Sequence, residues 1–169
     1  MDLEKRVVEL ERRVAAMEDA QRGEPRGGAA GEDAFWALEG LKEQLARHGE
    51  SDGGVLFTGA VRVPTGEEYE WQYGLPTGEL LDQDWSEAAD VFAALGHAVR
   101  MRLLREIVGG RRTVAELTEL DGLGDAGEIH HHLRQLAATG WLHAAEPEHY
   151  EVPPERVVPL LVVLAAARP

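Results

Sequence analysis

The stretch that decides the fold covers residues 113–142, TVAELTELDGLGDAGEIHHHLRQLAATGWL. Thr113 with Glu116, and Asp125 with Glu128, have the spacing of a capping box, in which the first residue and the third helical residue exchange hydrogen bonds. A glycine-containing tight turn, DGLGD, separates the two helix starts. The pattern predicts a short helix, a tight turn and a longer helix, which is a helix-turn-helix.

The flanking segments extend this pattern in both directions. Upstream, AADVFAALGHAVRMRLLREIVGG (88–110) contains two helices joined near Gly96-His97. Downstream, residues 141–152 contain two short strands around Pro147-Glu148, and PPERVVPLLVVLAA (153–166) forms a final helix that begins with prolines. A helix-turn-helix followed directly by a β-hairpin is the winged-helix layout.

Three motifs resemble those of ArsR-type winged helix-turn-helix transcriptional regulators. They are LGHAVRMRLL (95–104), in which Ala98 replaces a frequent proline, TVAEL (113–117), and IHHHLRQL (129–136) followed by GWL. The resemblance covers about residues 90–152 of the 169. It implies a homodimeric bacterial regulator that binds operator DNA.

The helix at 125–139 offers side chains that suit this function. With Ile129, Leu133 and Leu136 buried, a step of 100° per residue turns Arg134 and Gln135 away from the core. Arginine can recognise guanine and glutamine adenine in the major groove. We expect double-stranded DNA to be contacted by Arg111, Arg112, Thr113, Gly127, His130, His131, Arg134 and Gln135. Arg100, Arg102 and Arg105 are further candidates for phosphate contacts.

An alternative function remains open because the same region is acidic. Glu128 stands near the start of the expected recognition helix, and the wing at 143–151 has no Lys or Arg but has Glu146, Glu148 and Glu151. A wing that contacts DNA usually has the opposite charge. A winged-helix protein that no longer binds DNA, and acts as a protein–protein adaptor or assembly module, is the alternative.

The net charge of −14 excludes a protein that coats nucleic acid or anionic membranes. The acid is concentrated in residues 32–90, with fourteen Asp or Glu and three Lys or Arg. This segment is either a solvated surface or a docking face for a basic protein partner. The longest apolar run, 157–167, is too short to span a bilayer, and the charged N-terminus is not a signal peptide, so we expect a cytoplasmic protein.

Residues 1–22 predict a coiled-coil helix, followed by a flexible linker at 23–31. Its seam has a spacing of 4, 3, 4, 3, with valine at a and mainly leucine at d, which favours a parallel dimer; a helix that folds back on its own domain is the alternative. The final helix is apolar nearly all round and predicts a second dimer contact. The expected interface residues are Leu3, Val7, Leu10, Val14, Met17, Val158, Leu161 and Leu164.

Residues 32–85 predict an acidic accessory segment made of a helix at 32–48 and a β-hairpin. The hairpin strands are GVLFTGAVRV and EEYEWQY around Pro64-Thr65-Gly66, and one face of the second strand is aromatic. We expect this face to pack on a helix; a small-molecule sensor that uses the aromatic face at 55–73 is a second alternative. LPTGELLDQDW is expected to be a loop, after which Ser86 caps the next helix.

The sequence offers no enzyme chemistry, cofactor site or metal site. The absence of cysteine excludes thiolate ligands and nucleophiles, and neither a Gly-rich phosphate loop nor G-x-S-x-G occurs. His130, His131 and His132 point 100° apart on a helix and cannot close on one ion. The expected fold class is α+β, mainly α with small β-hairpins: a winged helix-turn-helix domain at 86–169, preceded by the acidic segment and the coiled-coil helix.

Overall fold

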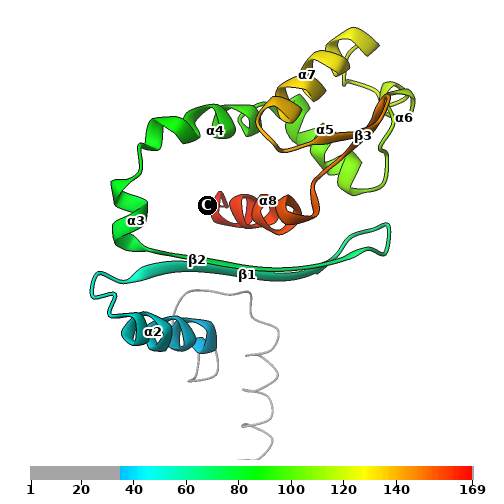
Figure 1. Cartoon of the computed structure of the whole chain (residues 1–169). Helices are drawn as coiled ribbons and strands as arrows, with labels where there is room; N and C mark the ends of the chain where they lie inside the picture. Colours follow the sequence, from blue (N-terminus) through cyan, green and yellow to red (C-terminus); the bar gives the residue numbers. More distant parts are fainter. Residues whose placement is uncertain (1–34, 169) are drawn as a thin grey trace, which may run out of the picture. The chain divides into compact units, whose positions relative to one another are not determined.

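The computed structural model describes residues 35–168, drawn in colour in Figure 1. These residues form seven α-helices and two two-stranded antiparallel hairpins, which confirms the α+β class. The predicted coiled coil at 1–22, with Leu3, Val7, Leu10, Val14 and Met17, and the predicted linker at 23–31 lie outside the described residues. The chain divides into two compact units at Gly40, so the described part of the first unit is only the start of helix α2 (Trp36–His48).

The long hairpin pairs β1 (Gly54–Arg62) with β2 (Glu68–Pro76), from Gly54 opposite Pro76 to Arg62 opposite Glu68. The predicted Pro64-Thr65-Gly66 turn is confirmed: the Val63 amide donates to the Glu67 carbonyl at 3.0 Å, and Gly66 has a φ of 89°. Strand β2 continues beyond its predicted end at Tyr73, as far as Pro76, whereas β1 ends at Arg62, one residue before its predicted end.

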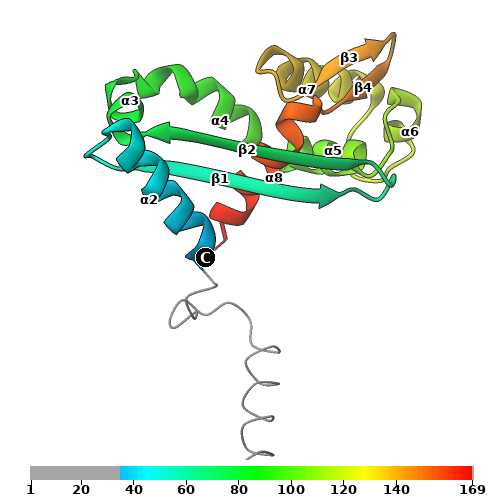
Figure 2. The same ribbon diagram turned by 60° about the horizontal axis from the view of Figure 1, so that its bottom comes forward.

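Helix α8 (Pro154–Ala166) packs on one face of this hairpin (Figures 1 and 2). A Cβ atom added to Gly59 would lie 2.6 Å from a Val158 methyl group, so the absence of a side chain permits this close approach. Trp71 lies opposite Gly59, and Tyr73 lies opposite Phe57, so the aromatic residues share this face. The prediction that this face packs on a helix holds for Tyr69, which is packed against the core, whereas Trp71 and Tyr73 remain 37 % and 48 % exposed.

The segment after the hairpin differs from the expectation. Residues Thr77–Asp82 form helix α3 instead of a loop, and a 3₁₀ turn, η2 (Trp85–Ala88), leads into α4 (Ala89–Leu95). The prediction that Ser86 caps the helix is wrong, because the Asp84 carboxylate accepts a hydrogen bond of 2.9 Å from the Ser86 amide. The capping group therefore stands two residues earlier.

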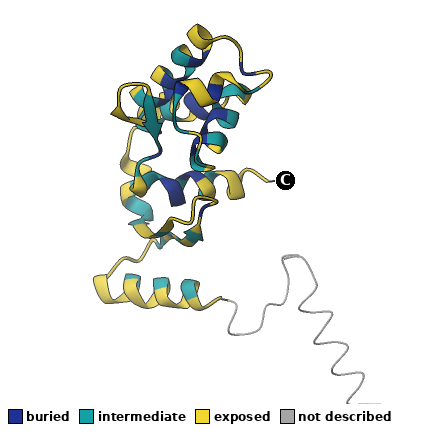
Figure 3. Cartoon of the chain, turned by 90° about the vertical axis from the view of Figure 1, so that its right-hand side faces the viewer, coloured by how far each residue is buried: buried dark blue, intermediate teal, exposed yellow. Residues whose placement is uncertain are grey.

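The core is formed where α4, α5 (Ala98–Val108), α6 (Val114–Thr118), α7 (Ala126–Ala138) and α8 meet (Figure 3). The predicted break between α4 and α5 at Gly96-His97 and the predicted proline-initiated start of α8 are confirmed. Val63, at the end of the hairpin, belongs to the same core. None of the described helices is both long and apolar enough to span a bilayer.

The two ends of α8 have different environments, which corrects one predicted dimer contact. Val158 is 1 % exposed and packs inside the chain, so its side chain has almost no surface left to bury against a second copy. Leu161 and Leu164 are 36 % and 40 % exposed. Of the three predicted α8 interface residues, these two therefore have apolar surface that a second copy could bury.

Candidate nucleic-acid interface

Two capping boxes define the starts of α6 and α7, as the sequence predicted. The Thr113 hydroxyl accepts from the Glu116 amide at 3.3 Å, and the Glu116 carboxylate accepts from the Thr113 amide at 3.0 Å. Asp125 and Glu128 make the same exchange at 2.9 and 3.0 Å. Each glutamate therefore satisfies a backbone donor that a helix start leaves free.

The turn between these helices is fixed by its backbone and by one apolar anchor. Gly122 and Gly124 have φ values of 78° and 94°, a conformation that glycine adopts without a steric penalty. Leu123, between them, is 2 % exposed and belongs to the core. The turn therefore holds the start of α7 in place.

Helix α7 has one face in the core and another in solvent. Ile129, Leu133 and Leu136 are fully buried, as predicted from their spacing. Gly127, His131 and Arg134 are exposed. Within residues 35–168, the Arg134 guanidinium has neither an ion pair nor a hydrogen bond, so it is available to a ligand.

Arg112, one of the predicted DNA contacts, forms ion pairs within the chain. Its guanidinium pairs with Glu67 of the long hairpin and, at 3.2 Å, with Glu151. The hydrogen bond from Thr65, opposed by burial and helped by Arg112, lowers the pKa of the Glu67 carboxyl. Arg112 thus links two distant segments of the chain, which no local sequence signal indicated.

Other predicted contact residues are also engaged within the chain. The Gln135 side-chain oxygen accepts a hydrogen bond from Arg100, whose guanidinium also bonds to the carbonyls of Ala93 and Ala94. Arg102 donates to the Asp121 carbonyl at 2.6 Å. The Thr113 hydroxyl is used in its capping box. These groups position the helices.

Three further candidate contact residues have more exposed positions. Arg111 has a side chain 49 % exposed and a loose contact of 3.6 Å with Glu106. His130 is half-buried, with its Nε2 atom 3.9 Å from Glu148. Arg105 is exposed on α5. The predicted DNA-contacting arginines that keep exposed side chains are therefore Arg105, Arg111 and Arg134.

A second hairpin lies beside the helix-turn-helix. Strands β3 (His143–Glu146) and β4 (His149–Glu151) confirm the predicted pair, and Thr113 forms an isolated bridge with His149. The Tyr150 amide donates to the Arg112 carbonyl at 2.8 Å. The segment before α6 therefore pairs with β4 along the edge of this hairpin.

The His132 ring of α7 contacts the ring of His97, the residue before α5, which the sequence did not indicate. The His97 and His132 rings lie 4.7 Å apart, and the buried Nδ1 atom of His132 has no hydrogen-bond partner. Burial, followed by His97, Arg100 and His131, lowers the pKa of His132. Across the described residues, no three His, Cys, Asp or Glu side chains gather as a metal site would require.

An apolar cavity beside the long hairpin lies on the face opposite the aromatic residues. Its volume is about 250 Å³, and its walls include Leu41 and Leu45 of α2 with Leu56 and Gly74 of the hairpin. Leu56 and Gly74 lie on the face opposite Gly59 and Trp71. Trp71 and Tyr73, which the sensor alternative required, lie on the α8 side.

Comparisons with known proteins identify no family for this chain. No protein-family model matches the chain. No curated protein matches it either.

Proposed function

We propose that the protein is a homodimeric DNA-binding transcriptional regulator of the winged-helix type. Helix α7 is the recognition helix, and the β3–β4 hairpin is the wing. The observation that carries the proposal is the presentation of α7: three buried leucine or isoleucine side chains fix the helix, while Arg134 projects from its opposite side without a partner in the described chain.

The geometry also supplies a reason why the acidic cap residues are compatible with DNA. The Glu116 carboxylate is held by hydrogen bonds from the Thr113 amide and hydroxyl, which lower its pKa. Glu128 accepts from the Asp125 amide at 3.0 Å. Each negative charge is therefore directed at its own helix start, where the helix dipole stabilises it.

Arg134 and Arg111 are the side chains assigned to DNA in this proposal. A guanidinium on the exposed face of a recognition helix can donate two hydrogen bonds to the O6 and N7 atoms of guanine. Arg111, before α6, is placed to meet phosphate oxygens. Two protomers would contact two half-sites about one DNA turn apart.

The test begins with selection of duplexes from a random-sequence pool at low salt, followed by titration of the selected sequence. Arg134→Ala should weaken specific binding by about 1–3 kcal/mol if Arg134 contacts a base. Arg47→Ala, which removes an exposed arginine of α2, is the matched control and should change binding little. If no sequence is enriched, or if both variants bind like the wild type, the DNA proposal fails.

The acidic wing favours a second candidate function, a protein adaptor. Glu146 and Glu148 are exposed on this hairpin, and Arg112 is neutralised by Glu67 and Glu151. Glu128→Gln separates the two functions, because glutamine can keep the capping hydrogen bond while losing the charge. DNA binding should stay equal or become tighter, whereas a complex with a basic protein should weaken.

A further inference from the structure

The segment α3–η2–α4 carries three large apolar side chains that are mostly exposed to solvent. Leu81 is 64 % exposed, Trp85 69 % and Phe92 60 %. We call these three residues the α3–α4 stripe. The stripe belongs to α3, η2 and α4. Helix α4 contacts α7, but the stripe contains no residue assigned to DNA, so an inference about it goes beyond the proposed DNA-binding function and does not depend on it.

The Trp85 side chain is held in its exposed position. Its indole nitrogen donates a hydrogen bond of 2.8 Å to the Leu80 carbonyl, at the residue before Leu81. The polar atom of the ring is therefore satisfied within the chain, and the remaining surface of the ring is apolar. An ordered, exposed tryptophan of this kind is typical of a binding hot spot.

Trp85 and Phe92 share one side of a nearly continuous helical path. The turn η2 leads directly into α4, since Ala88 and Ala89 both have helical dihedral angles. A separation of seven residues places two side chains on the same helix face. Ala94, which is about 200° from Phe92 around the helix and so on the other side of α4, is buried in the core.

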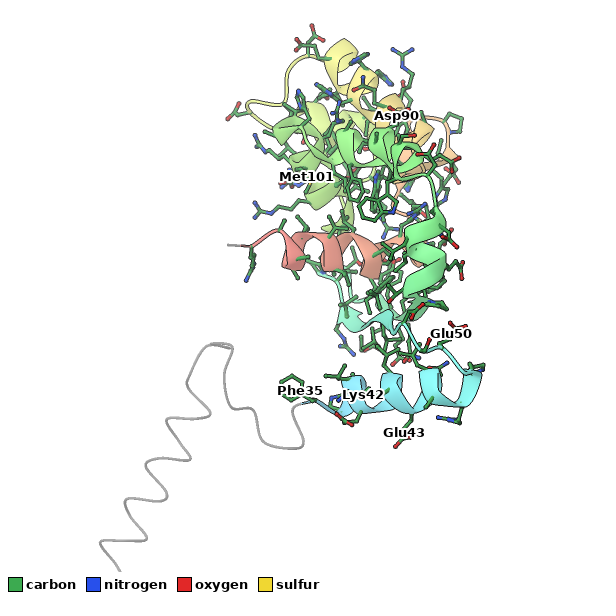
Figure 4. All side chains as sticks on the ribbon, turned by 90° about the vertical axis from the view of Figure 1, so that its left-hand side faces the viewer. Phe35, Lys42, Glu43, Glu50, Asp90 and Met101 are labelled. Carbon is green, nitrogen blue, oxygen red and sulfur yellow. The ribbon has the colours of Figure 1, made fainter. Side chains whose placement is uncertain are left out.

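The charged residues within the segment that carries the stripe are all acidic. The Arg100 guanidinium, which reaches the end of α4, is bound to the Ala93 and Ala94 carbonyls and to Gln135. Glu79, Asp82, Glu87 and Asp90 are exposed, and none of them forms an ion pair among the described residues. Residues 63–99 contain eight acidic residues and no Lys or Arg. Figure 4 shows α3 and α4 from this side, with Asp90 labelled on α4.

We propose that the α3–α4 stripe binds a basic amphipathic helix of a protein partner. Apolar side chains of such a helix, spaced three or four residues apart, would cover Leu81, Trp85 and Phe92. Its Lys and Arg side chains would meet the flanking carboxylates, which gives the complex its orientation and its salt dependence.

The charge pattern also argues against the other occupants. Two copies of the same stripe would bring carboxylates against carboxylates, which disfavours a symmetric self-contact. Nucleic acid and anionic lipid would meet the same repulsion. A cationic partner is the one that matches both the apolar residues and the charge.

The experiment uses the full chain and a synthetic leucine/lysine peptide of about four helical turns, with leucine at helical spacing. Calorimetric titration at low and high salt should show binding that weakens as salt increases. A peptide with glutamate in place of every lysine, and one with the same composition but alternating leucine and lysine, are the peptide controls. Neither should bind comparably.

Variants then locate the site. Trp85→Ser with Phe92→Ser should weaken binding roughly tenfold or more, as the loss of hot-spot residues does. Val55→Ser with Leu38→Ser is the matched control, since these side chains are 56 % and 42 % exposed and belong to β1 and α2. Asp82→Asn with Asp90→Asn should reduce the salt dependence, whereas Glu119→Gln with Asp121→Asn should not.

Three results would overturn the proposal: no binding of the lysine peptide, equal binding by the Trp85/Phe92 variant and the wild type, or comparable binding of the glutamate peptide. If the wild type self-associates and the Trp85/Phe92 variant does not, the occupant is a second copy and the proposal is also wrong. Arg134→Ala should leave peptide binding unchanged, so failure of the DNA proposal remains distinguishable. A thermal melt of every variant checks that it is folded.

Discussion

His132 shows how one side chain in the helix-turn-helix couples folding to proton concentration. Its ring contacts His97, whose Nδ1 atom caps α5 by accepting from the Val99 amide at 3.2 Å. Burial is the main cause that lowers the pKa of His132; His97, Arg100 and His131 act in the same direction, and Glu128 acts against them. The folded protein therefore favours the neutral imidazole.

We expect this histidine to make the protein less stable in acid. A lowered pKa in the folded state means that the contribution of neutral His132 is complete above its ordinary pKa of 6.5 and decreases as the pH falls below that value. Thermal melts between about pH 7 and pH 5 should show a smaller loss of stability for His132→Leu than for the wild type. His48→Leu, which removes an exposed histidine of α2, is the control. Equal pH slopes for His132→Leu and the wild type would contradict the prediction.

At the scale of elements, the contact between the long hairpin and α8 depends on Gly59, because glycine has no side chain that would collide with the helix. Gly59 permits Val158 to approach the strand, and Val158 is buried on its other sides. The hairpin tip is also attached to the segment before α6, through Arg112 and Glu67. The hairpin is therefore packed as part of the core.

Gly59→Ala should lower the free energy of unfolding by about 1–3 kcal/mol, because the new methyl group overlaps a buried valine that cannot move aside. Adding Val158→Ala should restore part of the loss, since the two positions are in direct contact and their effects are not additive. Gly78→Ala in α3 is the control: no atom lies within 4 Å of the added Cβ. Urea denaturation of the four proteins measures the effect, and an unchanged midpoint for Gly59→Ala would exclude the close approach.

At the scale of the whole molecule, α8 belongs to the core through one side and has apolar side chains exposed on the other. Leu160 is 3 % exposed, whereas its neighbour Leu161 is 36 % exposed. Leu161 and Leu164 also line a groove of about 410 Å³, together with Met101 and Leu104 of α5. In the proposed dimer, this groove would add apolar surface of α5 to the contact that Leu161 and Leu164 make.

Leu161→Ser with Leu164→Ser should therefore raise the protein concentration needed for dimer formation without unfolding the monomer. Sedimentation over a range of micromolar concentrations measures the change. Leu160→Ala is the contrasting variant and should lower the free energy of unfolding by about 2–5 kcal/mol through a core cavity. A serine variant that dimerises like the wild type would show that α8 is no part of the interface.

The sequence by itself determined the local features of this protein. The two capping boxes, the buried stripe of α7, the Pro64-Thr65-Gly66 turn and the break before α5 depend on residues within a few positions of one another. Local hydrogen bonding and hydrophobic periodicity are sufficient to specify such features. The helix at Thr77–Asp82 was missed because its residues are weakly apolar and its start has no side-chain cap.

The tertiary structure alone decided which of the predicted contact residues remain available. Arg112 meets Glu67 across 45 positions, and Arg100 meets Gln135 across 35, so no local pattern could reveal that these pairs form. The same holds for Val158, which is apolar like Leu161 but is directed at Gly59. Partners distant in the chain are brought together by the packing of the core, and it is this packing that separates the exposed Arg134 from the arginines that hold the fold together.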